Sequence, residues 1–320
     1  MLRLIIAVFC LCAVSMVPAL ASTDTTIKAV SSGTAHEALF GLCMNGTRVI
    51  AVGQHGLVLD SDDAGETWTE RERFTSAALL DVDCGDRTEL YVGQSGELYR
   101  SHDGELEAVS SGTDARLMSV GQSPDGSLAV AVGAFGAILI STDDGRTWQP
   151  SSLDWFAVLE DYVEPHLYDV HVANDGSITV IGEFALVLQS TDGGMTWQKR
   201  HQGESSLFGL NIDSVGIGFA VGQEGTVLTT RDAGESWAAI ATPSNDILLN
   251  VGRTAAGDIV ATGIRKFIVS SDQGATWLEY ADAALTTGWY QGLALLSTDA
   301  ARQSVLLAGH QARILKIELK

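Results

Sequence analysis

The sequence is poor in proline, in basic side chains and in cysteine. Only 5 of its 320 residues are proline, which excludes collagen-like and proline-rich disordered chains. Lysine and arginine number 19 against 40 aspartate and glutamate residues, a formal net charge of -21. A chain this acidic lacks the basic face that nucleic-acid phosphates require, and it lacks a polybasic patch for anionic membranes. We therefore expect no nucleic-acid partner.

Long apolar runs are missing beyond the N-terminus. Residues 4–17 are apolar and follow a short positive start, but a bilayer-spanning helix takes about 20 residues. Residues 19–21, Ala-Leu-Ala, have the small-x-small pattern of a signal-peptide cleavage site. The pattern predicts a signal peptide at 1–21, cleaved after Ala21, and a periplasmic or secreted mature chain of residues 22–320. An uncleaved anchor is the alternative.

Familiar catalytic motifs are missing as well. The mature chain has no Ser elbow, His-Glu-x-x-His, phosphate loop or Cys-x-x-Cys metal spacing. We therefore expect no enzyme, no cofactor and no metal. A glycosidase with two catalytic carboxylates stays open, because 40 acidic residues always contain candidate pairs.

Cysteine is scarce in the mature chain, which keeps only Cys43 and Cys84. Both lie near the end of the same predicted element in adjacent repeats. An exported protein meets an oxidising compartment, so a disulfide between them is allowed. Two buried free thiols are the equally weighted alternative.

Glycine is abundant instead, at 34 residues, and much of it belongs to a repeated motif. The motif reads Ser-x-Asp-x-Gly-x-Thr-Trp and recurs five times with small changes, and a degenerate copy at 101–104 lacks the tryptophan. The repeated aspartates are Asp63, Asp103, Asp143, Asp192, Asp232 and Asp272. The repeated tryptophans are Trp68, Trp148, Trp197, Trp237 and Trp277. The aspartates are 40, 40, 49, 40 and 40 residues apart, a period that indicates a repeat architecture.

Each repeat reads as four short strands. A Leu-x-x-Val-like segment opens seven units, and a hairpin turn, an apolar run, a Gly-x-x-Gly turn and a third strand precede the aspartate motif. Four strands in about 43 residues are typical of a β-propeller blade. The sequence therefore predicts an all-β chain, a single seven-bladed β-propeller over residues 22–320.

The two ends of the mature chain complement each other. The seventh unit has only three strands before the C-terminus. Residues 27–34, Ile-Lys-Ala-Val-Ser-Ser-Gly-Thr, nearly repeat residues 106–113, Leu-Glu-Ala-Val-Ser-Ser-Gly-Thr, which form the fourth strand of the second unit. We predict that the mature N-terminal strand completes the last blade and closes the ring.

The motif has the chemistry of a stabilised turn. An aspartate can accept backbone N–H bonds within its own turn, and serine and threonine hydroxyls add further bonds. Glycine adopts backbone angles that other residues resist, and tryptophan buries a large apolar surface. A catalytic role would not need five equivalent copies around a ring, so we interpret the motif as structural.

The motif resembles the Asp-box, or BNR repeat, of sialidases, sortilin-type receptors and photosystem II assembly factors. Seven blades, an exported chain and Val-Gly-x-x-Gly turns most resemble the Ycf48/HCF136 family and its relatives in non-photosynthetic bacteria. The resemblance implies a non-enzymatic protein-binding platform that assists an inner-membrane complex, possible partners including an RND-type transporter. Photosynthetic members bind through an arginine patch, whereas the arginines here are scattered.

The runner-up function is a glycan-binding or glycan-hydrolysing Asp-box propeller. Sialidases have six blades and an Arg-Ile-Pro signature, and neither fits this sequence. The partner that the resemblance implies is a membrane-protein complex facing the periplasm, and we expect the propeller itself to be a monomer.

The step of 49 residues places an insertion at 151–166, on the face where blades are joined. It combines aromatic and acidic residues, and aromatics are enriched at binding hot spots. The candidate partner-binding residues are Trp155, Phe156, Tyr162, Glu164 and His166, with Arg116, Trp289 and Tyr290 at the mouth of the same face. A short helix capping its own blade, and a metal site at Glu164 and His166, are the alternatives.

The third positions of the inner strands are small or polar. They are Gly41, Asp81, Ser119, Asp169, Gly209, Asn250 and Gly292. Either they line a functional channel, or they are small because seven strands crowd together there.

Overall fold

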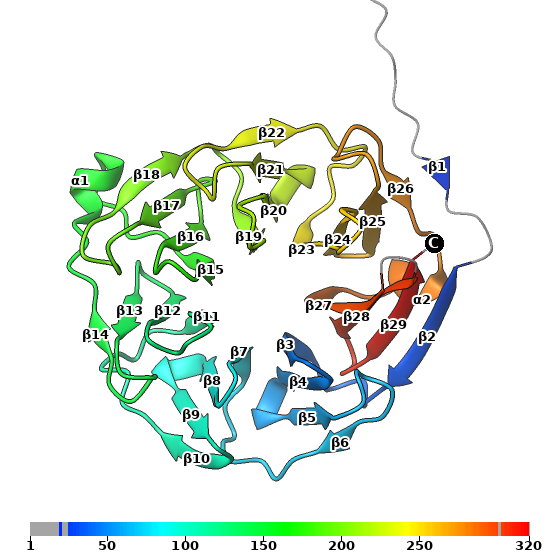
Figure 1. Ribbon diagram of the computed structural model, residues 1–320, viewed down its shortest axis with the longest axis horizontal. Coiled ribbons are helices and arrows are strands. Elements are labelled where there is room, and N and C mark those ends of the chain that lie inside the picture. The colour runs from blue at the N-terminus through cyan, green and yellow to red at the C-terminus, as the bar shows by residue number, and fades with distance from the viewer. Residues whose placement is uncertain (1–18, 21–24, 300–301, 320) are drawn as a thin grey trace, which may run out of the picture.

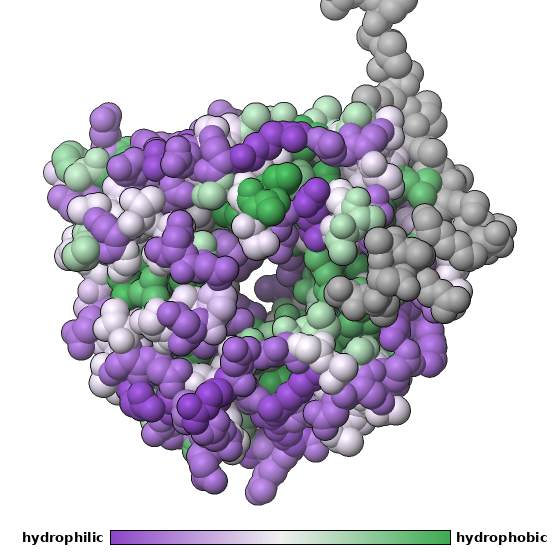
Figure 2. Space-filling view, viewed as in Figure 1, coloured by the Kyte–Doolittle hydropathy of each residue, from purple (hydrophilic) through white to green (hydrophobic). Residues whose placement is uncertain are grey.

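Seven largely antiparallel sheets form a closed ring (Figure 1), and a channel opens at its centre (Figure 2). This computed structural model describes residues 19–20, 25–299 and 302–319. Most of the predicted signal peptide, including Ala21, lies outside the described residues. Within the part that is described, no helix is long and apolar enough to cross a membrane. The predicted seven-bladed β-propeller is confirmed.

In blades 1 to 6 the strands follow one another outwards from the channel in chain order. Blades 1 and 2 consist of β3 (Leu39–Asn45), β4 (Arg48–Gly53), β5 (Val58–Ser61), β6 (Thr69–Glu70), β7 (Leu79–Cys84), β8 (Thr88–Gly93), β9 (Leu98–His102) and β10 (Glu105–Ala108). Blades 3 and 4 consist of β11 (Leu117–Gln122), β12 (Ala129–Gly133), β13 (Ile138–Ser141), β14 (Gln149–Pro150), β15 (Leu167–Val172), β16 (Ile178–Gly182), β17 (Val187–Ser190) and β18 (Gln198–His201).

Blades 5 and 6 consist of β19 (Leu207–Ile212), β20 (Gly218–Gly222), β21 (Val227–Thr230), β22 (Ala238–Ile240), β23 (Leu248–Arg253), β24 (Ile259–Gly263), β25 (Lys266–Ser270) and β26 (Leu278–Glu279). Two short helices, α1 (Trp155–Leu159) and α2 (Ala283–Thr286), precede blades 4 and 7. β1 (Ala19–Leu20) pairs in parallel with β26 at the edge of blade 6.

The seventh blade is built from both ends of the chain. β27 (Tyr290–Asp299), β28 (Arg302–Gly309) and β29 (Ile314–Leu319) come from the C-terminus, and β2 (Thr26–Ser31) adds the outermost strand. β2 is antiparallel to β29, with Thr26 opposite Glu318 and Ser31 opposite Ile314 (Figure 1). The predicted closure by the mature N-terminal strand is confirmed.

Antiparallel blades give the ring two different faces. The turns between second and third strands and the loops between blades lie on one face, named here the loop face. The hairpins between first and second strands and the aspartate motifs lie on the other, named here the Asp-box face. The insertion at 151–166 therefore belongs to the loop face.

The first Asp-box shows how the motif holds its turn. Asp63 accepts bonds from the Thr67 amide (2.9 Å), the Thr67 hydroxyl (2.6 Å) and the Ser61 hydroxyl (2.8 Å). Ser61 in turn accepts the Gly65 amide (2.9 Å). Because these bonds favour the charged carboxylate, they lower the pKa of Asp63 to about 2, those from Thr67 contributing most. The boxes at Asp143, Asp192, Asp232 and Asp272 repeat this geometry.

In the blades that have an Asp-box, the same turn contacts the preceding blade. A Cβ on Gly65 would lie 2.5 Å from the Leu306 side chain of blade 7, and one on Gly145 would lie 2.6 Å from Leu90 of blade 2. Both glycines also have a positive φ, of 81° and 77°. Glycine is needed twice over, because the angle is left-handed and the preceding blade leaves no room for a side chain.

Blade 2 departs from the motif. Asp103 and Gly104 form a two-residue hairpin between β9 and β10, with φ of 51° and 88°, as type I′ turns require. Asp103 pairs with Arg87 instead of capping a turn. The prediction that Asp103 belongs to a degenerate Asp-box is therefore wrong, because the glycine comes one residue too early.

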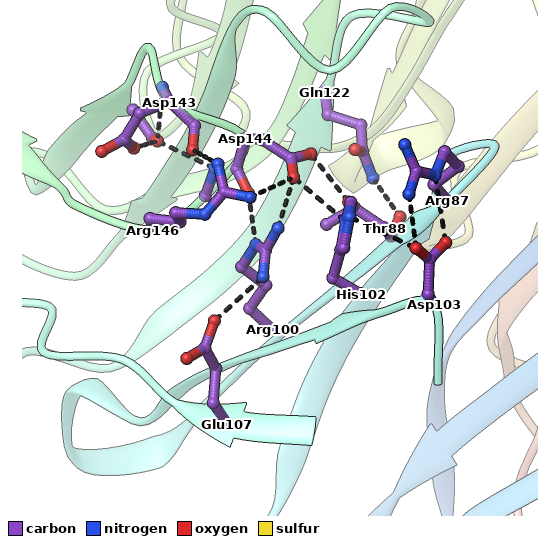
Figure 3. A network of polar contacts seen from close by, with 12 residues as sticks. Arg87, Thr88, Arg100, His102, Asp103, Glu107, Gln122, Asp143, Asp144 and Arg146 are labelled. Carbon is purple, nitrogen blue, oxygen red and sulfur yellow. Dashed lines mark hydrogen bonds and ion pairs between the residues drawn. The ribbon is translucent and has the colours of Figure 1, made fainter. Parts of the chain in front are cut away.

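The boundary between blades 2 and 3 still has an Asp-box, supplied by blade 3 (Figure 3). Its Asp144 accepts the hydroxyl of Thr88 at 2.7 Å and pairs with the buried guanidinium of Arg100, both from blade 2. Arg100 also pairs with Glu107 at 2.9 Å. Ion pairs thus reinforce the apolar contact made by Gly145.

The boundary between blades 1 and 2 has no Asp-box, and a disulfide crosses it. Cys43 on β3 is bonded to Cys84 on β7, with the two Cα atoms 5.6 Å apart. Of the two alternatives that the sequence left open, the structure has the disulfide. Arg71 of blade 1 adds bonds to Tyr91 (2.8 Å) and Glu89 (3.1 Å) of blade 2.

The boundary between blades 6 and 7 also lacks an Asp-box, because the third and fourth strands of blade 7, β29 and β2, are far apart in the sequence and no turn joins them. Helix α2, in the loop before blade 7, contributes apolar contacts to this boundary from the loop face. Leu285 of α2 is buried in one cluster with Tyr280 and Tyr290. The Tyr290 hydroxyl donates to the Ala284 carbonyl at 2.8 Å.

Removal of β2 should open the ring. We compare residues 22–320 with residues 35–320, each preceded by methionine. Losing the ladder with β29 leaves an unpaired edge and removes Ile27 from the apolar cluster against which it packs, so the shorter chain should melt about 5 °C lower or more. Equal melting temperatures in calorimetry would contradict this closure.

Loss of the disulfide should loosen the boundary between blades 1 and 2. Replacing both cysteines with serine (C43S/C84S) should cost about 2–4 kcal/mol, since the bridge closes a loop spanning 41 residues. Denaturant unfolding measures the loss. Reductant should lower the wild type to the value of the variant and leave the variant unchanged. The role of the disulfide would be refuted if free thiols can be titrated in the wild type and its stability equals that of the variant.

Candidate functional site

A β-bulge in every inner strand shapes the mouth of the channel. The pairing register shifts between the first and third positions of each inner strand, for example between Leu39 and Gly41 in β3. A bulge leaves one residue unpaired and re-aims its side chain. The bulged residues gather around the loop-face mouth, and we name them the collar: Phe40, Leu80, Met118, Tyr168, Phe208, Leu249 and Gln291.

The collar is apolar except for Gln291, and its members are only partly buried. Tyr168 and Phe208 meet edge to face, with ring centroids 5.0 Å apart. Phe40 stacks on Trp289 at 5.8 Å. The sequence did not predict the collar. In a regular strand the side chains alternate between the two faces, so only the third position, and not the second, would point into the channel.

Polar side chains lie just below the collar. One hollow along the channel is lined by the collar and the third positions, and a second is lined by residues further along the inner strands. Asp81, Asp169 and Asn250 line both, so they lie where the two halves of the channel meet. Figure 2 shows the channel opening at the centre of a mostly hydrophilic face.

These polar side chains bind the inner strand of a following blade. Asp81 accepts the Val120 amide at 3.1 Å, and Asp169 accepts the Leu210 amide at 2.7 Å. The side-chain amide of Asn250 donates to the backbone carbonyl of Gln291 at 2.8 Å. The third positions therefore line the channel and at the same time connect the blades.

The remaining third positions include three glycines. A Cβ on Gly41 would lie 2.7 Å from the Cα of Asp81, and one on Gly209 would lie 2.6 Å from the Cα of Asn250. Gly292 is similarly confined by Leu42. Crowding of the seven inner strands, one of the two interpretations of the sequence, therefore explains the three glycines. The other third positions are explained by hydrogen bonds between blades.

Ser119 connects two carboxyl groups in the channel. Its hydroxyl oxygen lies 2.8 Å from Asp81 and 2.9 Å from Asp169. A hydroxyl has one hydrogen, so both contacts can be hydrogen bonds only if one carboxyl is protonated and donates. Burial, with the nearby charge of Asp169, raises the pKa of Asp81 to about 7. Burial likewise raises the pKa values of Asp169 and Asp83 to about 6.

The insertion at 151–166 contains the short helix that was one of the alternatives. Asp154 caps α1 by accepting the amides of Phe156 (3.0 Å) and Ala157 (3.3 Å). Figure 1 places α1 at the rim of the ring, away from the channel. Phe156 and Tyr162 contact each other, their rings 4.7 Å apart, and both are exposed, Tyr162 to 90%.

Trp155 does not share that exposure. It packs against the apolar cluster between blades 3 and 4. Its indole lies over Gly136, where a Cβ would come within 2.2 Å of the ring nitrogen. Trp155 therefore anchors the insertion, and its part in partner binding stays a prediction.

Two further aromatics extend the exposed surface, and sequence reasoning did not select them. Phe135 is 68% exposed and Phe184 is 39% exposed, each at the third position of a Gly-x-x-Gly-like turn. Their φ values of 56° and 60° are left-handed. Such a backbone costs a bulky residue on the order of 1 kcal/mol, and costs of this kind cluster at functional sites.

The other predicted residues are dispersed. His166 lies beside Phe135, at 5.1 Å between rings, and its Nδ1 accepts the Phe135 amide at 3.1 Å. Glu164 is exposed on the insertion, and Arg116 is exposed on the loop before blade 3. Among the described residues no group of three or more His, Cys, Asp or Glu is arranged to hold a metal.

Trp289 and Tyr290 lie across the ring, where blade 7 begins. Trp289 is half-buried beside Phe40, far around the ring from the insertion. Tyr290 is 1% exposed, so its predicted place on the binding surface is wrong. Tyr290 occupies the first position of an inner strand, and the residue at that position is buried in every blade.

Comparison with known proteins agrees with this architecture. A family model described as photosynthesis system II assembly factor YCF48 matches residues 150–277, from the last strand of blade 3 into blade 6. No curated protein matches the sequence significantly.

Solved structures share the fold across nearly the whole chain. YCF48 bound to D1 peptide is 14% identical with a TM-score of 0.71, over 95% of this chain and 100% of that one. YCF48 from Cyanidioschyzon merolae is 18% identical with a TM-score of 0.71, over 91% and 98%. Virginiamycin B lyase from Staphylococcus aureus, a catalytically inactive form with quinupristin, is 12% identical with a TM-score of 0.77, over 93% and 100%.

The fold and the repeated turns define an Asp-box β-propeller of seven blades. This chain is similar to the Ycf48 family, in sequence over the matched segment and in fold around the ring, so the expected resemblance is confirmed. The resemblance supports a role in protein binding or assembly.

The channel carboxyls should make stability fall as pH rises. A raised pKa means that the protonated form is the stabilised one, so stability is lost as the pH rises through about 7 for Asp81. Because burial lowers the pKa of His171, that residue adds stability as the pH rises through its ordinary value of 6.5, which offsets only part of the loss from Asp81, Asp169 and Asp83. The melting temperature should therefore drop between pH 6 and 8, and D81N should flatten that drop.

The matched control is D192N, which removes an Asp-box carboxylate whose pKa is lowered to about 2. That group contributes stability above pH 3.8, which is lost only as the pH falls towards 2. D192N should lower the melting temperature at neutral pH without changing its slope between pH 6 and 8. Parallel curves for D81N and wild type would show that Asp81 does not titrate there.

Proposed function

We propose that this propeller is an exported, non-enzymatic platform that binds protein partners and assists the assembly of an inner-membrane complex facing the periplasm. The observation that carries the proposal is the uneven distribution of exposed apolar side chains. Five of the eight large hydrophobic residues that are exposed among the described residues lie on the loop face: Phe135, Phe156, Tyr162, Phe184 and Ile264. Exposed aromatic clusters of this kind mark protein-binding surfaces.

The comparisons support the same role. The matched family is described as one of assembly factors, and a solved relative is titled as bound to a D1 peptide. The N-terminal pattern supports export with cleavage after Ala21. An RND-type transporter is a specific partner consistent with an exported relative of this family. The chain's acidity distinguishes its binding mode from that of an arginine patch.

The interior does not favour the glycan-cleaving alternative. Retaining and inverting glycosidases need two carboxyl groups free to face the substrate. Here Asp81 and Asp169 are engaged by backbone amides of following blades, and Glu164 lies on the surface. We therefore assign the channel acids to the connection between blades.

Affinity capture tests the platform. The mature protein, F156A/Y162A and the control M195A, whose Met195 is 73% exposed on the Asp-box face, are each used to capture proteins from solubilised envelopes of expressing cells. Wild type and M195A should retain the same membrane proteins. F156A/Y162A should retain about tenfold less or lower, as expected when aromatic hot spots are truncated.

Equal recovery with all three proteins would refute a platform at this face. Turnover of fluorogenic glycosides that disappears in E164Q would establish the glycan alternative instead. The N-terminal sequence of the protein recovered from the envelope tests cleavage after Ala21.

A further inference from the structure

Aromatic side chains form a line across the loop face of blades 3 to 5. The line begins at the rim with Phe156 and Tyr162 and passes to Phe135, whose ring meets His166. The His166 amide donates to Glu183 at 2.8 Å, and Phe184 is the next residue in that turn. We name this line, Phe156, Tyr162, Phe135, Phe184, Tyr168 and Phe208, the aromatic track.

The track ends at the channel. Tyr168 meets Phe208 of the collar. Burial raises the pKa of Tyr168, and the nearby charge of Glu183 raises it further. The track thus connects the insertion at the rim with the mouth of the channel. No other part of the loop face has as many exposed aromatics among the described residues.

Six carboxylates accompany the track. They are Glu160, Asp161, Glu164, Glu183, Glu204 and Glu224. None of them forms an ion pair with a described residue, whereas Glu37, Asp246 and Glu279 elsewhere on the same face do. Glu37 pairs with Arg73 at 3.2 Å near blade 1, and Lys266 pairs with both Asp246 (2.8 Å) and Glu279 (2.7 Å) in blade 6.

The backbone adds an independent indication. All seven turns between second and third strands place their third residue in the left-handed region, and five of those residues are polar or charged: His55, Ser95, Glu224, Arg265 and Gln311. Only Phe135 and Phe184, both on the track, place an aromatic ring there. Folding alone does not explain why a bulky residue occupies a strained turn and points towards solvent.

We infer that the aromatic track binds an extended polypeptide segment in which basic side chains alternate with apolar ones. The inference rests on the proposed protein-binding function and specifies the chemistry of the partner. In an extended chain alternate side chains point to opposite sides. Apolar residues would lie on the aromatic rings, and lysine or arginine would reach the unpaired carboxylates on either side.

Charge complementarity selects this occupant. The mature chain carries 18 basic and 40 acidic residues, a balance of 18 − 40 = −22, so it repels acidic partners and attracts basic ones at a distance. A small cation would not need the aromatic rings. An apolar partner without charge would leave six carboxylates desolvated at the edge of the interface.

Fluorescence anisotropy with a defined probe tests the inference. The probe is a labelled peptide of about nine residues that alternates lysine with phenylalanine or leucine, which spans about 30 Å when extended. Its counterpart carries glutamate in place of every lysine. The mature protein should bind the lysine peptide, more weakly as salt increases, and should not bind the glutamate peptide.

The variant F135S/F184S removes two rings without forcing a new backbone, because Ser95 occupies the same left-handed position in blade 2. It should bind the lysine peptide at least about tenfold more weakly. The control M195S, on the opposite face, should bind as the wild type does. The variant E160Q/E164Q/E224Q should weaken binding and reduce its dependence on salt.

Two results would overturn the inference. One is equal affinity of F135S/F184S and M195S for the lysine peptide, which would show non-specific attraction to an acidic protein. The other is a mature protein that binds neither peptide while F156A/Y162A still fails to capture its membrane partners. In that case the platform would stand, and the partner would have a different chemistry.

Discussion

The contact between an Asp-box and the preceding blade is the interaction on which the ring depends. Each box uses one carboxylate to fix a turn whose glycine then lies directly against a side chain of the neighbouring sheet. The bonds within the turn and the contact between blades are therefore coupled. A substitution that loosens the turn also separates two sheets, so the repeated aspartates hold the molecule together although they are exposed.

The two boundaries without this contact show how strictly the ring needs one. Between blades 1 and 2 a covalent bond from Cys43 to Cys84 and the bonds of Arg71 replace it. Between blades 6 and 7 a helix supplies Leu285 and a hydrogen-bond acceptor for Tyr290. On the channel side, Asp81, Asp169 and Asn250 make a second set of connections. The ring is thus joined at two radii, by turns outside and by polar side chains within.

The sequence predicts the blades because their period is fixed by backbone geometry. Four strands, three turns and a loop need about 43 residues, and the recurrence of Asp63 and its equivalents marks each unit. Asp103 misled because identity at two positions, Ser101 and Asp103, hid a glycine displaced by one residue, which changes the turn type. The N-terminal strand was predictable because residues 27–34 resemble the fourth strand of another blade.

The candidate site was less predictable, for reasons of geometry. A bulge in each inner strand moves Phe40, Tyr168 and their equivalents to the channel mouth, and bulges leave no clear mark in the order of apolar residues. The sequence predicts surface positions for Tyr290 and Trp155, but Tyr290 lies in an apolar core and Trp155 covers Gly136. Phe135 and Phe184 could have been found, since each stands at a turn position where other repeats carry polar residues.

The pairing of β2 with β29 has a consequence for the order in which the molecule is made. Thr26 and Glu318 are opposite each other, so β2 has no partner until Glu318 has been synthesised. Contacts this distant in sequence form late, because a long loop must close before they stabilise anything. We expect blades 1 to 6 to assemble while β2 remains a free edge. If the chain crosses a membrane unfolded, the circle can then be completed only on the far side, where its two ends first meet.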